Sequence, residues 1–173
     1  MLANVGAQNG ILQINAFVEN DDFYFYDPGY RFQGEAQHHI LNAVNGFDHK
    51  EMMVNFAFSG KMYDGDFTKV NDPLLHGKHA ASIWILLNRG VIASIEGLEE
   101  ISHDSRIVFN GQRFTSGQEV TEAMLGTEKQ VLTRLYAVCE TREELVALMD
   151  KIHHSVQVYD QTGKSMVVDM LGL

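Results

Sequence analysis

The sequence predicts an α+β fold in which antiparallel pairing dominates. Short runs of β-branched, aromatic and other apolar residues recur along the chain and are separated by turn residues. Two stretches carry the capping pattern that opens a helix, from Asp48 to Glu51 and from Thr141 to Glu144. With 173 residues, of which 45% are hydrophobic, the chain can bury a core without disulfides. These features together favour antiparallel strands covered by helices.

The first third of the chain is expected to form a hairpin followed by two helices. Residues 11–18 and 23–26 are the strand candidates, joined by a turn at 19–22, and Pro28-Gly29 is expected to end regular pairing because proline has no N–H to donate. The first helix is expected over residues 35–45 and ends at Gly46, and the second opens with Asp48 as its N-cap and closes at Gly60.

Residues 61–79 show little periodicity and are expected to form a linker or a long loop. Beyond them we expect one hairpin from residues 82–87 and 91–96, and another from 106–109 and 112–115 around Asn110-Gly111. A strand over 130–139, a helix from Thr141 to about residue 153, and strands at 156–159 and 166–169 complete the chain. The predicted domains are residues 1–74, a hairpin with two helices, and residues 75–173, an α+β part rich in hairpins.

Charge and composition exclude several classes of function. The net charge of −10, with 13 scattered basic residues, argues against nucleic acid as a partner. No apolar run approaches the roughly 18 residues that span a membrane, and the N-terminus does not resemble a secretory signal. We therefore expect no membrane partner. The single Cys139 cannot form an internal disulfide, so we expect a reducing, cytoplasmic setting.

One segment combines side chains that could hold a cation and phosphate. Gln13 and Asn15 share one face of the first strand, and Asp27 lies on one face of the second, because side chains alternate along a strand. If the register pairs Asn15 with Asp27, an amide and a carboxylate meet at the open end of the hairpin, with Arg31 four residues later. Such a set suits a hard cation holding phosphates. The alternative is a surface Asp–Arg pair that closes a turn.

The stretch Ile11-Leu-Gln-Ile-Asn-Ala-Phe-Val-Glu-Asn-Asp-Asp-Phe-Tyr-Phe-Tyr-Asp-Pro-Gly-Tyr-Arg31 resembles the late metal-binding segment of ATP-grasp enzymes. In that superfamily the second strand ends in Glu-x-Asn-x-Arg. The resemblance implies that Asn15 and Asp27 bind Mg²⁺ and ATP phosphates, and that Arg31, also at the cofactor, is catalytic. It further implies a small carboxylate substrate and ATP-dependent ligation to an amine.

The resemblance extends to both named branches of the superfamily. Asp22–Asp27 is similar to the biotin carboxylase version, as is Gly90–Glu100 to the hairpin that opens its C-terminal subdomain. Phe32-Gln-Gly34 and the helix from Asp48 to Gly60 are similar to the branch of the large subunit of carbamoyl-phosphate synthase.

The departures from the family pattern are equally specific. Gly29 replaces the middle Asn, Asn15 is neutral where Glu is common, and Asp27 is shorter than Glu. The resemblance covers only the C-terminal portion of such enzymes, so we expect a fragment that needs a missing N-terminal half or an upstream subunit and does not turn over ATP alone. The alternative is a non-catalytic packing or dimerisation module, and an exposed apolar face would make a homodimer possible.

Two histidine pairs invite a metal interpretation. Adjacent residues of a helix point about 100° apart, so neither His38-His39 nor His153-His154 forms a chelating face. We therefore expect both pairs to be ordinary histidines on a helix surface.

Overall fold

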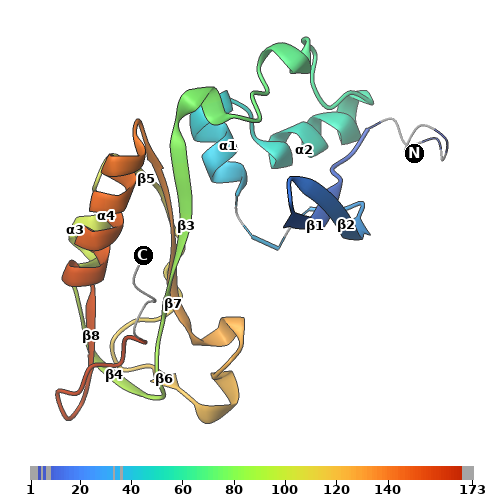
Figure 1. The fold of residues 1–173 in the computed structure, drawn as a ribbon. Coiled ribbons are helices and arrows are strands. Elements are labelled where there is room, and N and C mark those ends of the chain that lie inside the picture. The colour runs from blue at the N-terminus through green and yellow to red at the C-terminus, as the bar shows by residue number, and fades with distance from the viewer. Residues whose placement is uncertain (1–3, 5, 7–8, 33, 36, 169–173) are drawn as a thin grey trace. The chain divides into compact units, whose positions relative to one another are not determined.

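The computed structural model describes residues 4, 6, 9–32, 34, 35 and 37–168. Its contacts divide the chain into an N-terminal unit, Met1–Pro73, and a C-terminal unit, Leu74–Leu173. Both units combine helices with antiparallel strands (Figure 1), as expected for an α+β fold.

The N-terminal unit begins with the predicted hairpin. Strands β1 (Gln13–Glu19) and β2 (Asp22–Gly29) pair antiparallel around Asn20 and Asp21, whose φ angles of 51° and 65° are those of a tight hairpin turn. Regular pairing stops before Pro28, as expected, and one further pair, Gly29 with Gln13, follows beyond an irregularity between Gln13 and Asn15. Proline is tolerated here because β2 lies at an edge of a two-stranded sheet.

Two helices follow the hairpin and are ended by local signals. Helix α1 (His38–Asn45) starts three residues later than expected and stops at Gly46, whose φ of 73° is left-handed. Helix α2 (His49–Ser59) opens where Asp48 accepts a 2.7 Å hydrogen bond from the Lys50 N–H. The core of this unit is small and consists of Phe47, Met52 and Met62 with partly buried neighbours.

The C-terminal unit has two three-stranded antiparallel sheets, ordered β3-β7-β5 and β6-β4-β8. Its helices and strands are β3 (His79–Leu86), β4 (Gly90–Glu96), α3 (Leu98–Ser102), β5 (Ile107–Asn110), β6 (Glu119–Val120), β7 (Val131–Cys139), α4 (Arg142–Ser155) and β8 (Gln157–Asp160). The two helices contact each other, and α4 packs on β3 and β7 (Figure 1). A single large core forms between these layers.

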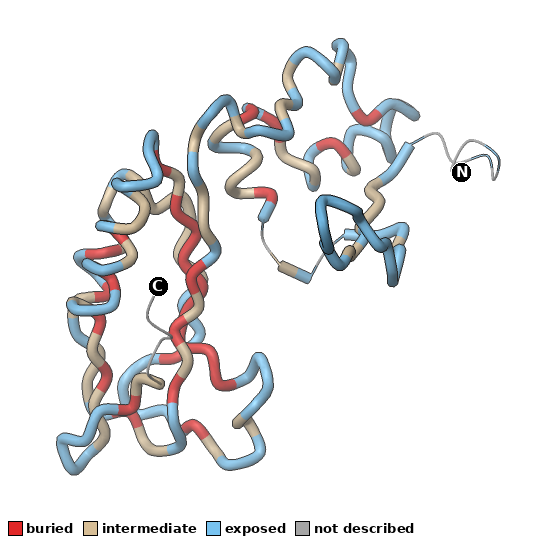
Figure 2. The backbone as a smooth tube through the Cα atoms, in the orientation of Figure 1, coloured by how far each residue is buried: buried red, intermediate tan, exposed pale blue. Residues whose placement is uncertain are grey.

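Two predicted hairpins of this unit are wrong. Strand β3 pairs with β7 rather than with β4, which pairs with β6 and β8. At Asn110-Gly111 the chain does not turn back. Instead the Gly111 and Arg113 N–H groups donate to carbonyl oxygens of Arg134 and Leu132 at 2.9 and 2.8 Å, so the segment continues along β7. Strand β7 is buried along nearly its whole length (Figure 2), and burial against it outweighs the local turn signal.

Other predictions for this unit are confirmed. The strand over 130–139 corresponds to β7, and Thr141 caps α4 by accepting a 3.1 Å hydrogen bond from the Glu144 N–H. Cys139 is free and buried. The last predicted strand reaches Asp169, which lies outside the described residues. In the described part of the chain, no helix has the length and apolar character needed to cross a membrane.

Candidate functional site

The side chains of Asn15 and Asp27 meet at the open end of the hairpin. The register places Asn15 opposite Tyr26 rather than opposite Asp27, yet the Asn15 Nδ2 lies 3.5 Å from the Asp27 Oδ2. The φ of Asp27 is 49°, a left-handed conformation that Asp tolerates better than most residues. This backbone turn is what brings a carboxylate that is one position out of register back toward the amide.

Arg31 extends from the chain just beyond β2. Its Nη1 donates a 3.2 Å hydrogen bond to the carbonyl oxygen of Phe32, and its side chain is exposed. A Cβ placed on Gly29 would lie 3.4 Å from the Arg31 Nε and 3.6 Å from its Cγ, so the Arg31 side chain passes over Gly29. The position that carries Asn in the family pattern is therefore next to the guanidinium.

The Asn15–Asp27 pair offers few oxygen ligands to a cation. Asp27 supplies one carboxylate, and Asn15 supplies a carbonyl oxygen if its amide rotates by 180°. Among the described residues, no group of three or more His, Cys, Asp or Glu side chains is placed to hold a metal ion. Mg²⁺ in nucleotide sites keeps several waters and needs only one or two carboxylates besides substrate phosphates. The residues thus fit a Mg²⁺ ion completed by phosphates, and they do not fit an all-protein metal site.

The hairpin that carries these residues is exposed on both faces. Phe17, Phe23 and Phe25 are 67%, 62% and 70% exposed, and Figure 2 shows both strands mostly in the colour of exposed residues. Neighbouring rings still stack, with 4.6 Å between the ring centres of Phe17 and Tyr26. A lone two-stranded hairpin is marginal in water, and large apolar patches on proteins mark interaction surfaces. The exposed rings therefore form an apolar surface of the kind that marks interaction sites.

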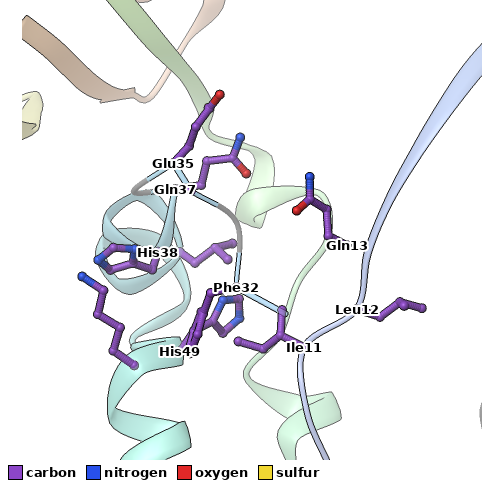
Figure 3. A pocket seen from close by; sticks show the side chains of 11 residues that line it. Ile11, Leu12, Gln13, Phe32, Glu35, Gln37, His38 and His49 are labelled. Carbon is purple, nitrogen blue, oxygen red and sulfur yellow. The ribbon is translucent and has the colours of Figure 1, made fainter. Parts of the chain in front are cut away.

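A cavity of about 300 Å³ is lined by Gln13, the first residue of β1, and by Phe32, which follows β2. Its walls come from the segment just before β1, the segment between β2 and α1, and the first turns of α1 and α2. Its polar lining consists of Gln13, Glu35, Gln37, His38, His49 and Lys50. In Figure 3 the amides of Gln13 and Gln37 and the imidazoles of His38 and His49 surround one opening, while the Glu35 carboxylate points away from the imidazoles.

Burial controls the charge of the histidines in this cavity. Only 9% of His38 is exposed, and this burial, followed by the charges of His39 and Lys50, holds its pKa below the usual value of 6.5. Burial also lowers the pKa of His49 and of His39. All three imidazoles are therefore neutral near pH 7, and each ring has one N–H donor and one nitrogen acceptor.

This cavity was not recognisable from the sequence. His38 was expected on a helix surface, but it is buried where the start of α1 meets the start of α2. Gln13 was placed on the same face as Asn15, without a role. The only local signal was the sequence Asp48-His49-Lys50 at a helix start, which puts imidazole and ammonium groups at that end of the helix.

The C-terminal unit contributes one strong ion pair. Asp104 accepts hydrogen bonds from the Arg106 Nε at 2.9 Å and Nη2 at 2.7 Å, and this pairing holds the pKa of its carboxyl well below the usual range. Lys151 adds a weaker contact at 3.6 Å. The pair joins the end of α3 to β5 and α4, so its role is structural.

Comparisons with known proteins identify the fold. No protein-family model matches the sequence, and no curated protein matches it. Among solved structures, L-amino acid ligase from Bacillus licheniformis superimposes with a TM-score of 0.69 at 15% identity, covering 92% of this chain and 38% of the ligase. Phosphoribosylglycinamide synthetase from Anaerococcus prevotii gives a TM-score of 0.71 at 13% identity, covering 92% and 39%.

Biotin carboxylase from Campylobacter jejuni, whose structure is a complex with β-γ-ATP, gives a TM-score of 0.67 at 16% identity, covering 95% of this chain and 34% of the carboxylase. This chain thus spans between a third and two fifths of the length of these three proteins. All three are ATP-grasp enzymes. The chain has an α+β fold that it shares with part of the ATP-grasp enzymes.

Proposed function

We propose that this chain is the C-terminal part of an ATP-grasp carboxylate–amine ligase, of the carbamoyl-phosphate-synthase-like branch, and that it contributes contacts to Mg·ATP phosphates. The observation that carries the proposal is the pairing of Asn15 and Asp27, 3.5 Å apart at the end of the hairpin, with Arg31 following on the same strand exit. The fold that this chain shares with part of three ATP-grasp enzymes supports it.

In this proposal each residue has a distinct task. Asp27 and the Asn15 carbonyl oxygen hold Mg²⁺ together with the ATP phosphates. The ion neutralises charge on the phosphates when it is bound. Arg31 stabilises negative charge on the group in transfer, since a guanidinium positioned where charge develops lowers the barrier. Phosphate would pass to a substrate carboxylate, and an amine would then attack the acyl-phosphate and displace phosphate.

The chain is proposed to act with a second polypeptide segment that supplies the remaining nucleotide contacts. One carboxylate and one amide are too few to hold Mg·ATP tightly. The doubly exposed hairpin β1–β2 supports such a partner, because burying Phe17, Phe23 and Phe25 would remove a large apolar surface from water. An ATP-grasp N-terminal half, either a separate subunit or an upstream part of one chain, is the proposed partner.

The test is Mg²⁺-dependent ADP formation in the presence of that half, supplied in trans or as a fusion. We expect Asp27→Ala to lower the rate by at least about tenfold, because it removes the only carboxylate of the proposed Mg²⁺ site. Asp22→Ala is the matched control, since Asp22 is an exposed carboxylate of the same hairpin next to the turn. An unchanged rate with Asp27→Ala would show that the catalytic assignment is wrong.

A second candidate is a non-catalytic packing or dimerisation module derived from the same fold. Gly29 and Asn15 favour it, because one family ligand position has no side chain to coordinate with and another carries a neutral amide where Glu is common. Titration of Mg·ATP against the isolated and the complemented chain separates the two candidates. Binding by the complemented chain supports the ligase, whereas absence of binding in both forms, together with a homodimer in sedimentation, supports the module.

A further inference from the structure

The cavity beside β1 contains a buried hydrogen-bond acceptor that the described part of the chain leaves unsatisfied. The Gln13 Oε1 is inaccessible to solvent and accepts no hydrogen bond from any described residue. A buried acceptor without a donor is costly, and most such atoms in folded proteins are satisfied. Because Gln13 lines the cavity, a turn of its side chain that exposes the Oε1 would let a bound molecule with an N–H group supply the missing donor.

The opposite wall of the same cavity favours an anionic group. Lys50 lies on this wall, close enough to His38 and His39 to influence the protonation of both. Helices α1 and α2 both begin here, and helix starts carry partial positive charge, which Asp48 and Glu51 offset at α2. The first turn of α1 has no acidic residue and no capping side chain to offset that charge. The His38 ring is buried beside this wall and can donate an N–H.

Between these two polar sides the wall is apolar. It is formed by Ile11, Leu12, Phe32 and Leu41. A volume of about 300 Å³ is at the lower end of the range for small-molecule sites and suits a molecule of about ten heavy atoms.

We propose that this pocket binds an α-amino acid with an apolar side chain, with its carboxylate at Lys50 and His38 and its amino group donating to the Gln13 Oε1. The proposal rests on the proposed function in one respect, because it names the class of the substrate that the ligase would take. The amino acid side chain occupies the apolar wall.

Binding can be measured on the full chain without ATP or Mg²⁺, by NMR of the histidine rings and by calorimetry. Three probes of one shape separate the two polar sides: L-leucine, 4-methylpentanoate, which lacks the amino group, and 3-methylbutylamine, which lacks the carboxylate. We expect L-leucine to bind at least about tenfold more tightly than either partial analogue, since each lacks a charge-assisted contact. The pKa of His38 should rise on binding of L-leucine or of the acid, because both bring a negative charge to its ring.

Two substitutions assign the contacts. Lys50→Met should weaken L-leucine and 4-methylpentanoate by about tenfold and leave 3-methylbutylamine unchanged. Gln13→Leu should weaken L-leucine and 3-methylbutylamine and leave the acid unchanged. Lys69→Met is the matched control, because Lys69 belongs to the same unit but pairs with Asp66 at 3.7 Å, away from the cavity. If Gln13→Leu does not fold, the side-chain amide signal of Gln13 in the unsubstituted chain reports the same contact with each probe.

The proposal is overturned if none of the probes binds, if L-leucine binds no better than its analogues, or if neither substitution alters its affinity. Because these measurements contain no nucleotide, they fail or succeed separately from ADP formation. If the chain binds L-leucine but forms no ADP with any N-terminal half, the amino-acid pocket is supported and the ligase function is refuted. If the chain forms ADP but does not bind L-leucine, the ligase function is supported and this substrate class is refuted.

Discussion

Replacing Gly97 with alanine should destabilise the C-terminal unit much more than the same replacement at Gly163. Both glycines have left-handed φ angles, 72° and 82°. They differ in their surroundings. A Cβ at Gly97 would fall inside contact distance of the Ser155 carbonyl oxygen and 2.7 Å from its carbonyl carbon, whereas a Cβ at Gly163 would meet nothing within 4 Å.

The expected magnitudes follow from this difference. A non-glycine residue in the left-handed region costs about 1–2 kcal/mol, and both variants lose this amount. At Gly97 the clash is with backbone at the end of α4, so α4 must shift against the sheet, which adds about 1–3 kcal/mol as in an overpacked core. We therefore expect losses of about 2–5 kcal/mol for Gly97→Ala and about 1–2 kcal/mol for Gly163→Ala.

Trp84 makes the assay specific for this unit. It is the only tryptophan of the chain, it lies in β3, and the Arg134 guanidinium stacks over its ring at 4.1 Å. Its fluorescence therefore reports unfolding of the C-terminal unit alone. For a unit of this size, each kcal/mol lowers the melting temperature by about 4–8 °C. Equal melting temperatures for the two variants would refute the reasoning, because the close approach of Gly97 to α4 would then carry no cost.

Three further predictions concern the site and the two units. Gly29→Asn should leave the fold intact, since the new Cβ meets only the flexible Arg31 side chain at 3.4 Å. It should increase the affinity of the complemented protein for Mg²⁺ by about tenfold, or about 1.4 kcal/mol. Isothermal titration calorimetry measures this affinity, and weaker Mg²⁺ binding would contradict the prediction. The N-terminal unit should lose stability as the pH falls below about 6.5, because the pKa values of His38, His39 and His49 are lowered in the folded state and the unfolded state therefore binds more protons. Amide hydrogen exchange of α1 and α2 as a function of pH measures this loss of stability. His38→Gln should make the stability depend less on pH. Asp104→Asn should cost the C-terminal unit about 2 kcal/mol at pH 7, because Arg106 loses its carboxylate partner. Since the pKa of Asp104 is lowered in the folded state, this stabilisation is present above the unfolded value of 3.8 and is lost as the pH falls through and below that value. Trp84 fluorescence during urea unfolding measures the loss, and a variant as stable as the parent at pH 7 would contradict the prediction.

The sequence by itself determined the features that depend on neighbouring residues. Asp48 and Thr141 cap helices as expected, and Gly46 and Gly60 end them in left-handed conformations. The turn between β1 and β2 is equally local, because its backbone conformation and the alternating strand residues on either side specify the hairpin. The α+β class follows from these elements, and the order and spacing of several segments, from residues 11–31 to 90–100, predicted a shared fold with part of the ATP-grasp enzymes.

Only the tertiary structure decided which strands pair and where a pocket forms. Asn110-Gly111 has the sequence of a hairpin turn, yet the chain runs on beside β7, because the free energy of covering that strand exceeds the preference of two turn residues. How Asn15 and Asp27 meet was also decided by the structure, because Asn15 lies opposite Tyr26 and the left-handed backbone of Asp27 brings its carboxylate back toward the amide. Gln13, His38 and Lys50 lie far apart in the sequence, and they share one cavity because the starts of two helices pack beside the first strand.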